Sequence, residues 1–197
     1  MGVKLVSASG GSVEINPPAT ASNFTATMPA GTGTVAVNGV SSNIVLGTAV
    51  ASTSGTSIDF TGIPSWVRRV TVMFSGVSTS GSSALLVQLG AGSVTTSGYL
   101  AASGGALNSS TPAVINSTAG FPIFANSASS ILHGNMTIAS IGSNIWSSSH
   151  SVGRSDSAIF LAGGGSVTLS GTLDRVRITT VNGTDTFDAG SINILYE

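Results

Sequence analysis

The sequence contains no cysteine, a single lysine (Lys4) and few charged residues of either sign. Charged side chains make up 7% of the 197 residues, against roughly 25% in ordinary soluble domains. The net charge is −1, so the chain has no basic surface of the kind that binds nucleic acid. Without cysteine, no disulfide stabilises the fold. We therefore expect no nucleic-acid partner and a surface solubilised by hydroxyls, amides and backbone.

Long apolar runs are also missing, although the mean hydropathy is +0.44. A membrane-spanning helix needs about 20 consecutive apolar residues. The best runs here, residues 44–51 and 84–92, are short and bounded by Ser, Asn and Gly. The first residues, MGVKLVSASGG, have one basic residue and no apolar core of a signal peptide. We expect neither a signal peptide nor membrane insertion.

The residues that are abundant indicate β-structure. Val, Ile, Leu and Phe recur in short alternating blocks separated by Gly, Asn, Ser and Pro, at the spacing of about 8 to 12 residues that is typical of sandwiches and barrels. In SWVRRVTVMF, alternation places the even-numbered residues from Trp66 to Phe74 on one face and Val67, Arg69, Thr71 and Met73 on the other. No segment shows a helical apolar stripe. The sequence predicts an all-β fold.

The chain divides by composition into two parts. Residues 1–46 read as short strands broken by GG, PP, PAGTG and VNG, with too little apolar mass to close a core alone. Residues 47–197 have the length of an ordinary single domain. We expect a stalk followed by a head.

Three stretches resemble a known family. KLVSASGGSVEINPPATASNFTATMPAGTGTVAVNG, residues 4–39, resembles shaft segments of tailed-bacteriophage fibre proteins. TSGTSIDFTGIPSWVRRVTVMFSGVSTSGSSALLVQLGAGS, residues 53–93, together with SGTLDRVRITTVNGTDTFDAGSINILYE, residues 170–197, resembles the C-terminal domain of phage tail-fibre and related virion proteins. The resemblance covers more than half of the chain. It implies a β-rich, usually trimeric virion appendage that contacts the host surface.

From this resemblance we expect short trimeric stalk strands over 1–46 and an antiparallel, jelly-roll-like β-sandwich head over 47–197. The expected function is that of a non-enzymatic virion structural protein, a tail fibre or similar appendage, assembled in the bacterial cytoplasm. Its expected partners are itself as a homotrimer, other virion proteins through the N-terminal segment, and a host-surface glycan or outer-membrane component. The alternatives are a purely structural virion subunit without host ligand, such as a collar, decoration or baseplate protein, and a polysaccharide-degrading spike.

Apolar residues occupy both faces of several expected strands, which independently favours assembly. In ALLVQL, Leu85, Val87 and Leu89 share one face while Leu86 lies on the other. A second copy of the chain would cover the second face. The alternative is that such strands are covered on both sides within one sandwich.

The scarce charges favour pairing, because unpaired charges are rarely buried. Arginines 68, 69, 175 and 177 are four of the five in the chain. The candidate structural ion pairs join Arg68, Arg69, Arg175 and Arg177 to Asp59, Asp174, Asp185 and Asp188. The functional rival is a basic patch that binds an acidic host polysaccharide, since guanidinium–carboxylate forks serve both purposes.

Ligand binding is expected in the irregular stretch 98–130 and around Trp146, because aromatic and amide side chains suit sugar rings. The candidate ligand-binding residues are Tyr99, Asn108, Asn116, Phe121, Asn126 and Trp146. The alternative is that the aromatics fill the core and the loops merely connect strands.

No catalytic, metal-binding or cofactor-binding motif emerges from the sequence. The carboxylates of residues 181–191 lack the spacing of a calcium loop, and we expect Asn182 and Gly183 to form a hairpin turn. His133 and His150 offer too few ligands for a closed metal site unless a trimer axis supplies three copies. No G-x-S-x-G motif is present. We expect no catalytic residues, no metal and no cofactor.

Overall fold

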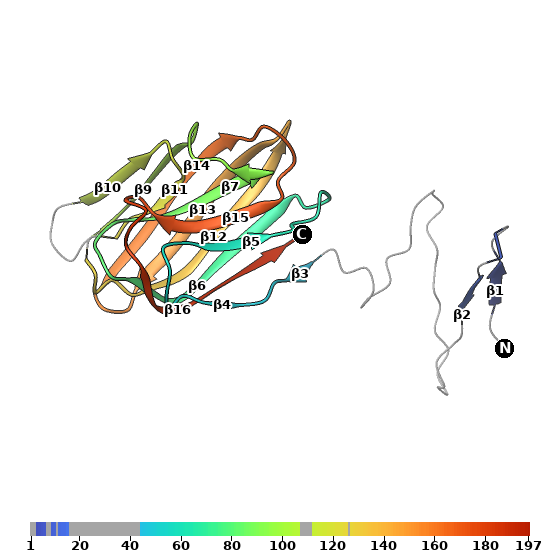
Figure 1. Cartoon of the computed structure of the whole chain (residues 1–197), viewed down its shortest axis with the longest axis horizontal. Helices are drawn as coiled ribbons and strands as arrows, with labels where there is room; N and C mark the ends of the chain where they lie inside the picture. The colour runs from blue at the N-terminus through green and yellow to red at the C-terminus, as the bar shows by residue number, and fades with distance from the viewer. Residues whose placement is uncertain (1–2, 7–8, 11, 16–43, 107–111, 126) are drawn as a thin grey trace. The chain divides into compact units, whose positions relative to one another are not determined.

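The computed structural model describes residues 3–6, 9–10, 12–15, 44–106, 112–125 and 127–197. The chain forms two compact units, Met1–Ala36 and Val37–Glu197 (Figure 1). In the first unit, β1 (Val3–Val6) pairs antiparallel with β2 (Ser12–Ile15). The described residues contain strands and turns but no helix, and hence no helix that could cross a membrane. The described fold is all-β and antiparallel, as the sequence predicts.

The second unit consists of two antiparallel sheets. The larger sheet has nine strands in the order β10-β9-β14-β13-β12-β6-β16-β3, with β4 also pairing with β16. The smaller sheet has five strands in the order β11-β7-β15-β5, with β8 pairing with β7. The strands of the larger sheet are β3 (Val45–Leu46), β4 (Val50–Ala51), β6 (Arg69–Thr79), β9 (Leu100–Ala106), β10 (Pro112–Ser117), β12 (Leu132–Gly142), β13 (Ile145–Arg154), β14 (Ile159–Thr168) and β16 (Phe187–Tyr196). Those of the smaller sheet are β5 (Ile58–Thr61), β7 (Leu85–Ala91), β8 (Ser93–Val94), β11 (Phe121–Ile123) and β15 (Arg175–Thr180).

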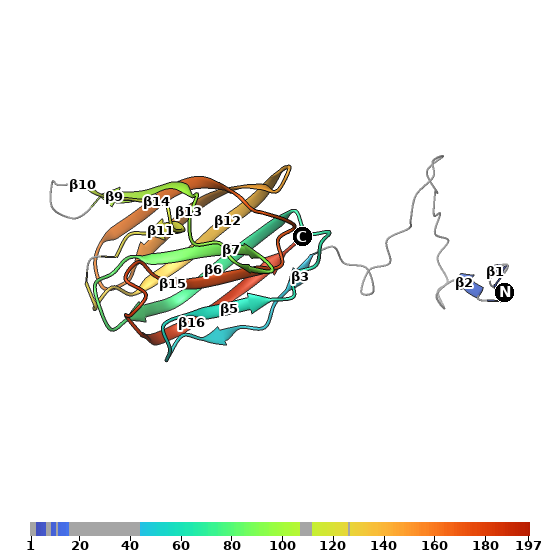
Figure 2. The same ribbon diagram turned by 45° about the horizontal axis from the view of Figure 1, so that its top comes forward.

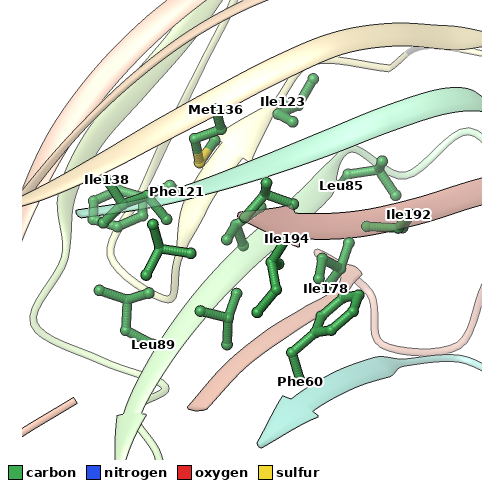
Figure 3. Close-up of a cluster of buried hydrophobic side chains, with 14 of the residues drawn as sticks. Phe60, Leu85, Leu89, Phe121, Ile123, Met136, Ile138, Ile178, Ile192 and Ile194 are labelled. Atoms are coloured by element: carbon green, nitrogen blue, oxygen red, sulfur yellow. The ribbon is translucent and has the colours of Figure 1, made fainter. Parts of the chain in front are cut away.

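The two sheets face each other and share one apolar core (Figure 2). From the larger sheet, β12 contributes Met136 and Ile138, and β16 contributes Ile192 and Ile194. From the smaller sheet, side chains of β5, β7 and β15 point back at them (Figure 3). Every second residue of β5 and β15 is buried, because successive side chains of a strand point to opposite faces.

The strand β6 follows the predicted alternation from Arg69 to Phe74, with Val70 and Val72 buried. Before Arg69 the prediction is wrong, because Trp66 is exposed and Val67 is buried. The cause is a turn in which the Val67 N–H donates to the Pro64 carbonyl at 3.1 Å, so the alternation of a strand begins only after this turn.

The strand β7 is buried on both faces by its own chain. Leu86 and Gln88 point away from the core, yet both are buried. The segment before β11 covers them: the Gln88 side-chain amide donates to the Ala119 carbonyl at 2.8 Å, and Gly120 lies against Leu86. The strand β7 is therefore covered on both sides within one sandwich, and its second apolar face gives no support for assembly.

Candidate functional site

The aromatic ligand candidates of the 98–130 stretch belong to the core. Tyr99 and Phe121 are 0% and 1% exposed and pack edge to face with ring centroids 5.0 Å apart. The Tyr99 hydroxyl accepts a hydrogen bond from the Leu89 N–H at 2.7 Å, and burial raises the pKa of Tyr99 to about 12. Neither ring offers a face on which a sugar could stack.

The amide candidates are more accessible, as far as the structure describes them. Asn116 lies on β10 and lines, with Tyr99, Leu100 and Thr118, a pocket of about 350 Å³ at the β9–β10 edge. Asn108 and Asn126 lie outside the described residues. Trp146, 4% exposed, lines a separate pocket of about 210 Å³. The structure thus brings Tyr99 and Asn116 together and places Trp146 elsewhere.

Three of the four candidate arginines hold carboxylates, and so does Arg154 of β13, which sequence analysis did not name and which binds Asp156. Arg177 grips Asp59 through Nε and Nη2, each 2.7 Å from a carboxylate oxygen. Arg175 holds Asp174 in the same manner at 2.7 and 3.0 Å. These hydrogen bonds keep the pKa of both aspartates below the usual range. Arg69 binds the Glu197 side chain.

The remaining charged candidates behave differently. Within the described residues, Arg68 has no carboxylate within 4.0 Å, and its Nη1 donates instead to the carbonyls of Ser65 and Val67 at 3.0 and 2.9 Å. Asp185 accepts from the Asn182 side-chain amide at 2.6 Å, and Asp188 binds the Ser78 hydroxyl. Asp185 therefore stabilises a turn and Asp188 links β16 to β6, and neither pairs with arginine in the part of the chain that the structure describes.

The two histidines lie in contrasting surroundings. His150 is buried, with Nε2 3.0 Å from Ser103 Oγ and with Nδ1 lacking a hydrogen-bond partner among the described residues. Burial lowers the pKa of His150 to about 4. His133 is exposed and accepts a hydrogen bond from the Gly76 N–H at 3.2 Å. No group of three or more His, Asp or Glu side chains in the described ranges could hold a metal ion.

The outward side of β9, β10, β13 and β14 is a surface of small uncharged residues, which we call the serine–glycine face. The registers of the β10–β9, β9–β14 and β14–β13 pairs place its residues side by side on neighbouring strands. It is formed by Ser147, Ser149 and Ser151 of β13, Ala162, Gly164 and Ser166 of β14, Ala102 and Gly104 of β9, and Asn116 of β10. Three apolar side chains at its margins, Leu100, Val114 and Phe160, are 61–76% exposed. Sequence analysis missed this face, although the alternating serines of residues 147–151 could have indicated it.

Comparison with models of known protein families, with curated proteins and with solved structures gives no match.

Proposed function

We propose that the chain is a non-enzymatic structural protein of a bacteriophage virion, a tail fibre or similar appendage, that acts as a homotrimer in contact with the host cell surface. In this proposal the N-terminal part of the expected 1–46 stalk forms strands that join other virion proteins. Residues 47–197 form a jelly-roll-like head, to which β3 (Val45–Leu46) also belongs because it pairs with β16. The particle would assemble in the bacterial cytoplasm. The virion assignment rests on the resemblance of residues 4–39, 53–93 and 170–197 to fibre proteins.

The observation that carries the assembly part is the serine–glycine face. All of its positions are uncharged, whereas the usual solvent-facing side of a sheet carries charged and polar side chains. Small side chains allow another surface to approach the backbone closely. The exposed Leu100, Val114 and Phe160 add apolar area at the margins, and apolar patches of this kind mark association surfaces. Closed symmetry is the usual outcome when identical chains associate.

The mass of the purified chain in solution tests this proposal. Light scattering or native mass spectrometry should give a molar mass three times that of one chain, which is 19.3 kDa. Ala162→Glu places a charge on the exposed centre of the serine–glycine face and should yield monomers, because burying an unpaired carboxylate is costly. Val181→Glu alters a residue that is 50% exposed outside this face and should leave the mass unchanged. A stable wild-type monomer in dilute solution would overturn the assembly part.

The alternative of a purely structural subunit gains support from one observation. Tyr99 and Phe121, which were candidates for stacking against sugars, are buried in the core. Binding to host cells separates the two functions: an attachment protein should bind the cell surface, whereas a purely structural subunit should bind only virion proteins.

A further inference from the structure

We propose that the 210 Å³ pocket around Arg68 binds a carboxylate group carried by a sugar, such as a uronic acid residue. The pocket lies where the start of β6, the β12–β13 hairpin and the segment before β15 meet. Its wall includes Arg68, Ser140, Asn144, Trp146 and Thr172. As a receptor contact this proposal rests on the proposed attachment function, but the pocket itself is built from a single chain.

The guanidinium of Arg68 has one edge engaged and one edge available. Both hydrogen bonds to the Ser65 and Val67 carbonyls come from Nη1, and none in the described residues comes from Nε or Nη2. In Arg175 and Arg177, Nε and Nη2 are the two atoms that grip a carboxylate. A guanidinium presents this edge as a planar fork that matches a carboxylate with two parallel hydrogen bonds. The structure therefore contains the same binding edge, oriented by backbone carbonyls, on a side chain that lines a pocket.

Two acids near this pocket already have side-chain partners: Asp174 directly follows the lining residue Leu173, and the Glu197 carbonyl accepts a hydrogen bond from the Arg68 N–H at 2.7 Å. Glu197 is held by Arg69, and Asp174 is held by Arg175 and by the Gly92 N–H. Neither carboxylate lies within 4.0 Å of the Arg68 guanidinium. The positive charge in the pocket is available to an anionic ligand, and the low charge of the whole chain leaves it few internal competitors.

The other wall residues favour a polyhydroxylated ligand over a bare anion. Ser140, Ser143, Asn144 and Thr172 supply hydroxyl and amide groups, which both donate and accept hydrogen bonds. Trp146 adds an aromatic side chain to the lining. The volume is below the roughly 300–1,000 Å³ typical of sites for drug-sized ligands, so it suits a small group at the end or side of a glycan.

Backbone hydrogen bonds hold the walls of the pocket in place. The Ser140 N–H donates to the Arg68 carbonyl at 2.8 Å, and the Leu169 N–H donates to the Asn144 carbonyl at 2.9 Å. Ser143 and Asn144 adopt positive φ angles of 52° and 59°, as a two-residue hairpin turn of type I′ requires. A pocket formed in advance loses less conformational entropy when a ligand binds.

Titration of the whole chain with sodium glucuronate, monitored by amide chemical shifts, tests the proposal. Glucuronate should shift the amides of residues 140–144 and the Trp146 indole. Glucose, which lacks the carboxylate, should not shift them at the same concentration. Acetate should bind more weakly than glucuronate because it lacks the hydroxyls. Added salt should weaken glucuronate binding, because charge attraction contributes to it.

Matched variants identify the group responsible. Arg68→Gln should weaken glucuronate binding at least about 10-fold, the usual effect of losing hydrogen bonds to a charged group. The affinity of Arg68→Lys for glucuronate should lie between those of the wild type and Arg68→Gln, because lysine keeps the charge but cannot form two parallel hydrogen bonds to a carboxylate. Arg177→Gln, which removes an arginine that binds Asp59 and does not line the pocket, should bind like the wild type. Asn144→Gly tolerates the positive φ and should weaken binding without disturbing the turn.

Several outcomes would overturn the proposal. These are no shift at residues 140–144 with glucuronate, equal binding of glucose, binding of acetate as tight as that of glucuronate, or unchanged affinity in Arg68→Gln. The two proposals fail separately. A monomer that binds glucuronate refutes the trimer and keeps the pocket, whereas a trimer that binds no glucuronate refutes the pocket and keeps the assembly.

Discussion

Acidification should weaken the folded state through the imidazole of His150. The side chain is 7% exposed, and within the described residues its one hydrogen-bond partner is the hydroxyl of Ser103, 3.0 Å from Nε2. Nδ1 has no partner there. Protonation would therefore create a charged ring with two N–H donors in a place that offers one oxygen. Burial accordingly lowers the pKa of His150 from 6.5 to about 4.

The sign and size of the effect follow from proton linkage. Between these two pKa values the unfolded chain binds a proton that the folded chain does not, so unfolding is favoured as the pH falls. The full contribution of His150 is present above its unfolded pKa of 6.5. Between about pH 7.5 and about pH 5, the free energy of unfolding should decrease by about 2 kcal/mol. The pKa values of Asp59, Asp156 and Asp174 are lowered from 3.8, so their losses occur at lower pH.

Urea denaturation at several pH values measures this dependence, and an NMR titration of the imidazole measures the pKa of His150 directly. His150→Gln should remove the decrease in this pH range, while His133→Gln, which keeps the buried ring, should retain it. The reasoning is refuted if the wild-type protein is equally stable at both ends of the range. It is also refuted if the imidazole of the folded protein titrates near 6.5.

Two further substitutions test the packing of the sheets by urea denaturation. Gly134→Ala should cost about 3 kcal/mol, because the added Cβ would lie 2.3 Å from the Ser151 carbonyl oxygen and φ is +139°. Gly153→Ala is the control, since nothing lies within 4 Å of its Cβ, and a similar loss in both variants would contradict the steric explanation. Tyr99→Phe should cost about 1–3 kcal/mol, because it leaves the buried Leu89 N–H without the hydroxyl that accepts its hydrogen bond. An unchanged free energy of unfolding would show that another acceptor replaces that hydroxyl.

The all-β class and the core-facing Val70, Val72 and Phe74 of β6 could be predicted from the sequence, because alternation of apolar residues directly reflects burial of one face of a sheet. The connection between β15 and β16 could not be predicted from the sequence. Gly183 does turn the chain, with a φ of +67°, but β15 and β16 belong to different sheets. The expected hairpin is therefore wrong. Turn chemistry is local, whereas the sheet that a following strand joins depends on contacts made across the whole domain.

For the arginines, composition predicts that they pair with acids, but topology decides which acid each one meets. Scarce and nearly balanced charges made pairing reasonable, and the sequence could name Arg177 and Asp59 as candidates. Their contact nevertheless spans 118 positions and depends on the register in which Arg177 lies opposite Asp59 in the β15–β5 pair. The isolation of Arg68 is equally a product of topology. Its neighbour Arg69 meets Glu197 because β6 and β16 are adjacent strands, whereas Arg68 precedes β6 and lies beside a hairpin that carries no acid.

Apolar residues on both faces of β7 do not by themselves predict assembly. An alternating pattern with apolar residues on both sides requires a second cover, but it does not say whether another chain or the same chain provides it. Here Ala119 contacts Gln88 and Gly120 lies against Leu86 within the same chain, and these contacts could not be predicted because the segment contains no apolar periodicity. The serine–glycine face has the opposite property: it has little apolar character in the sequence, and it carries no charge. If the chain assembles, we therefore expect the contact on the face with small side chains rather than on the strand with the most leucine.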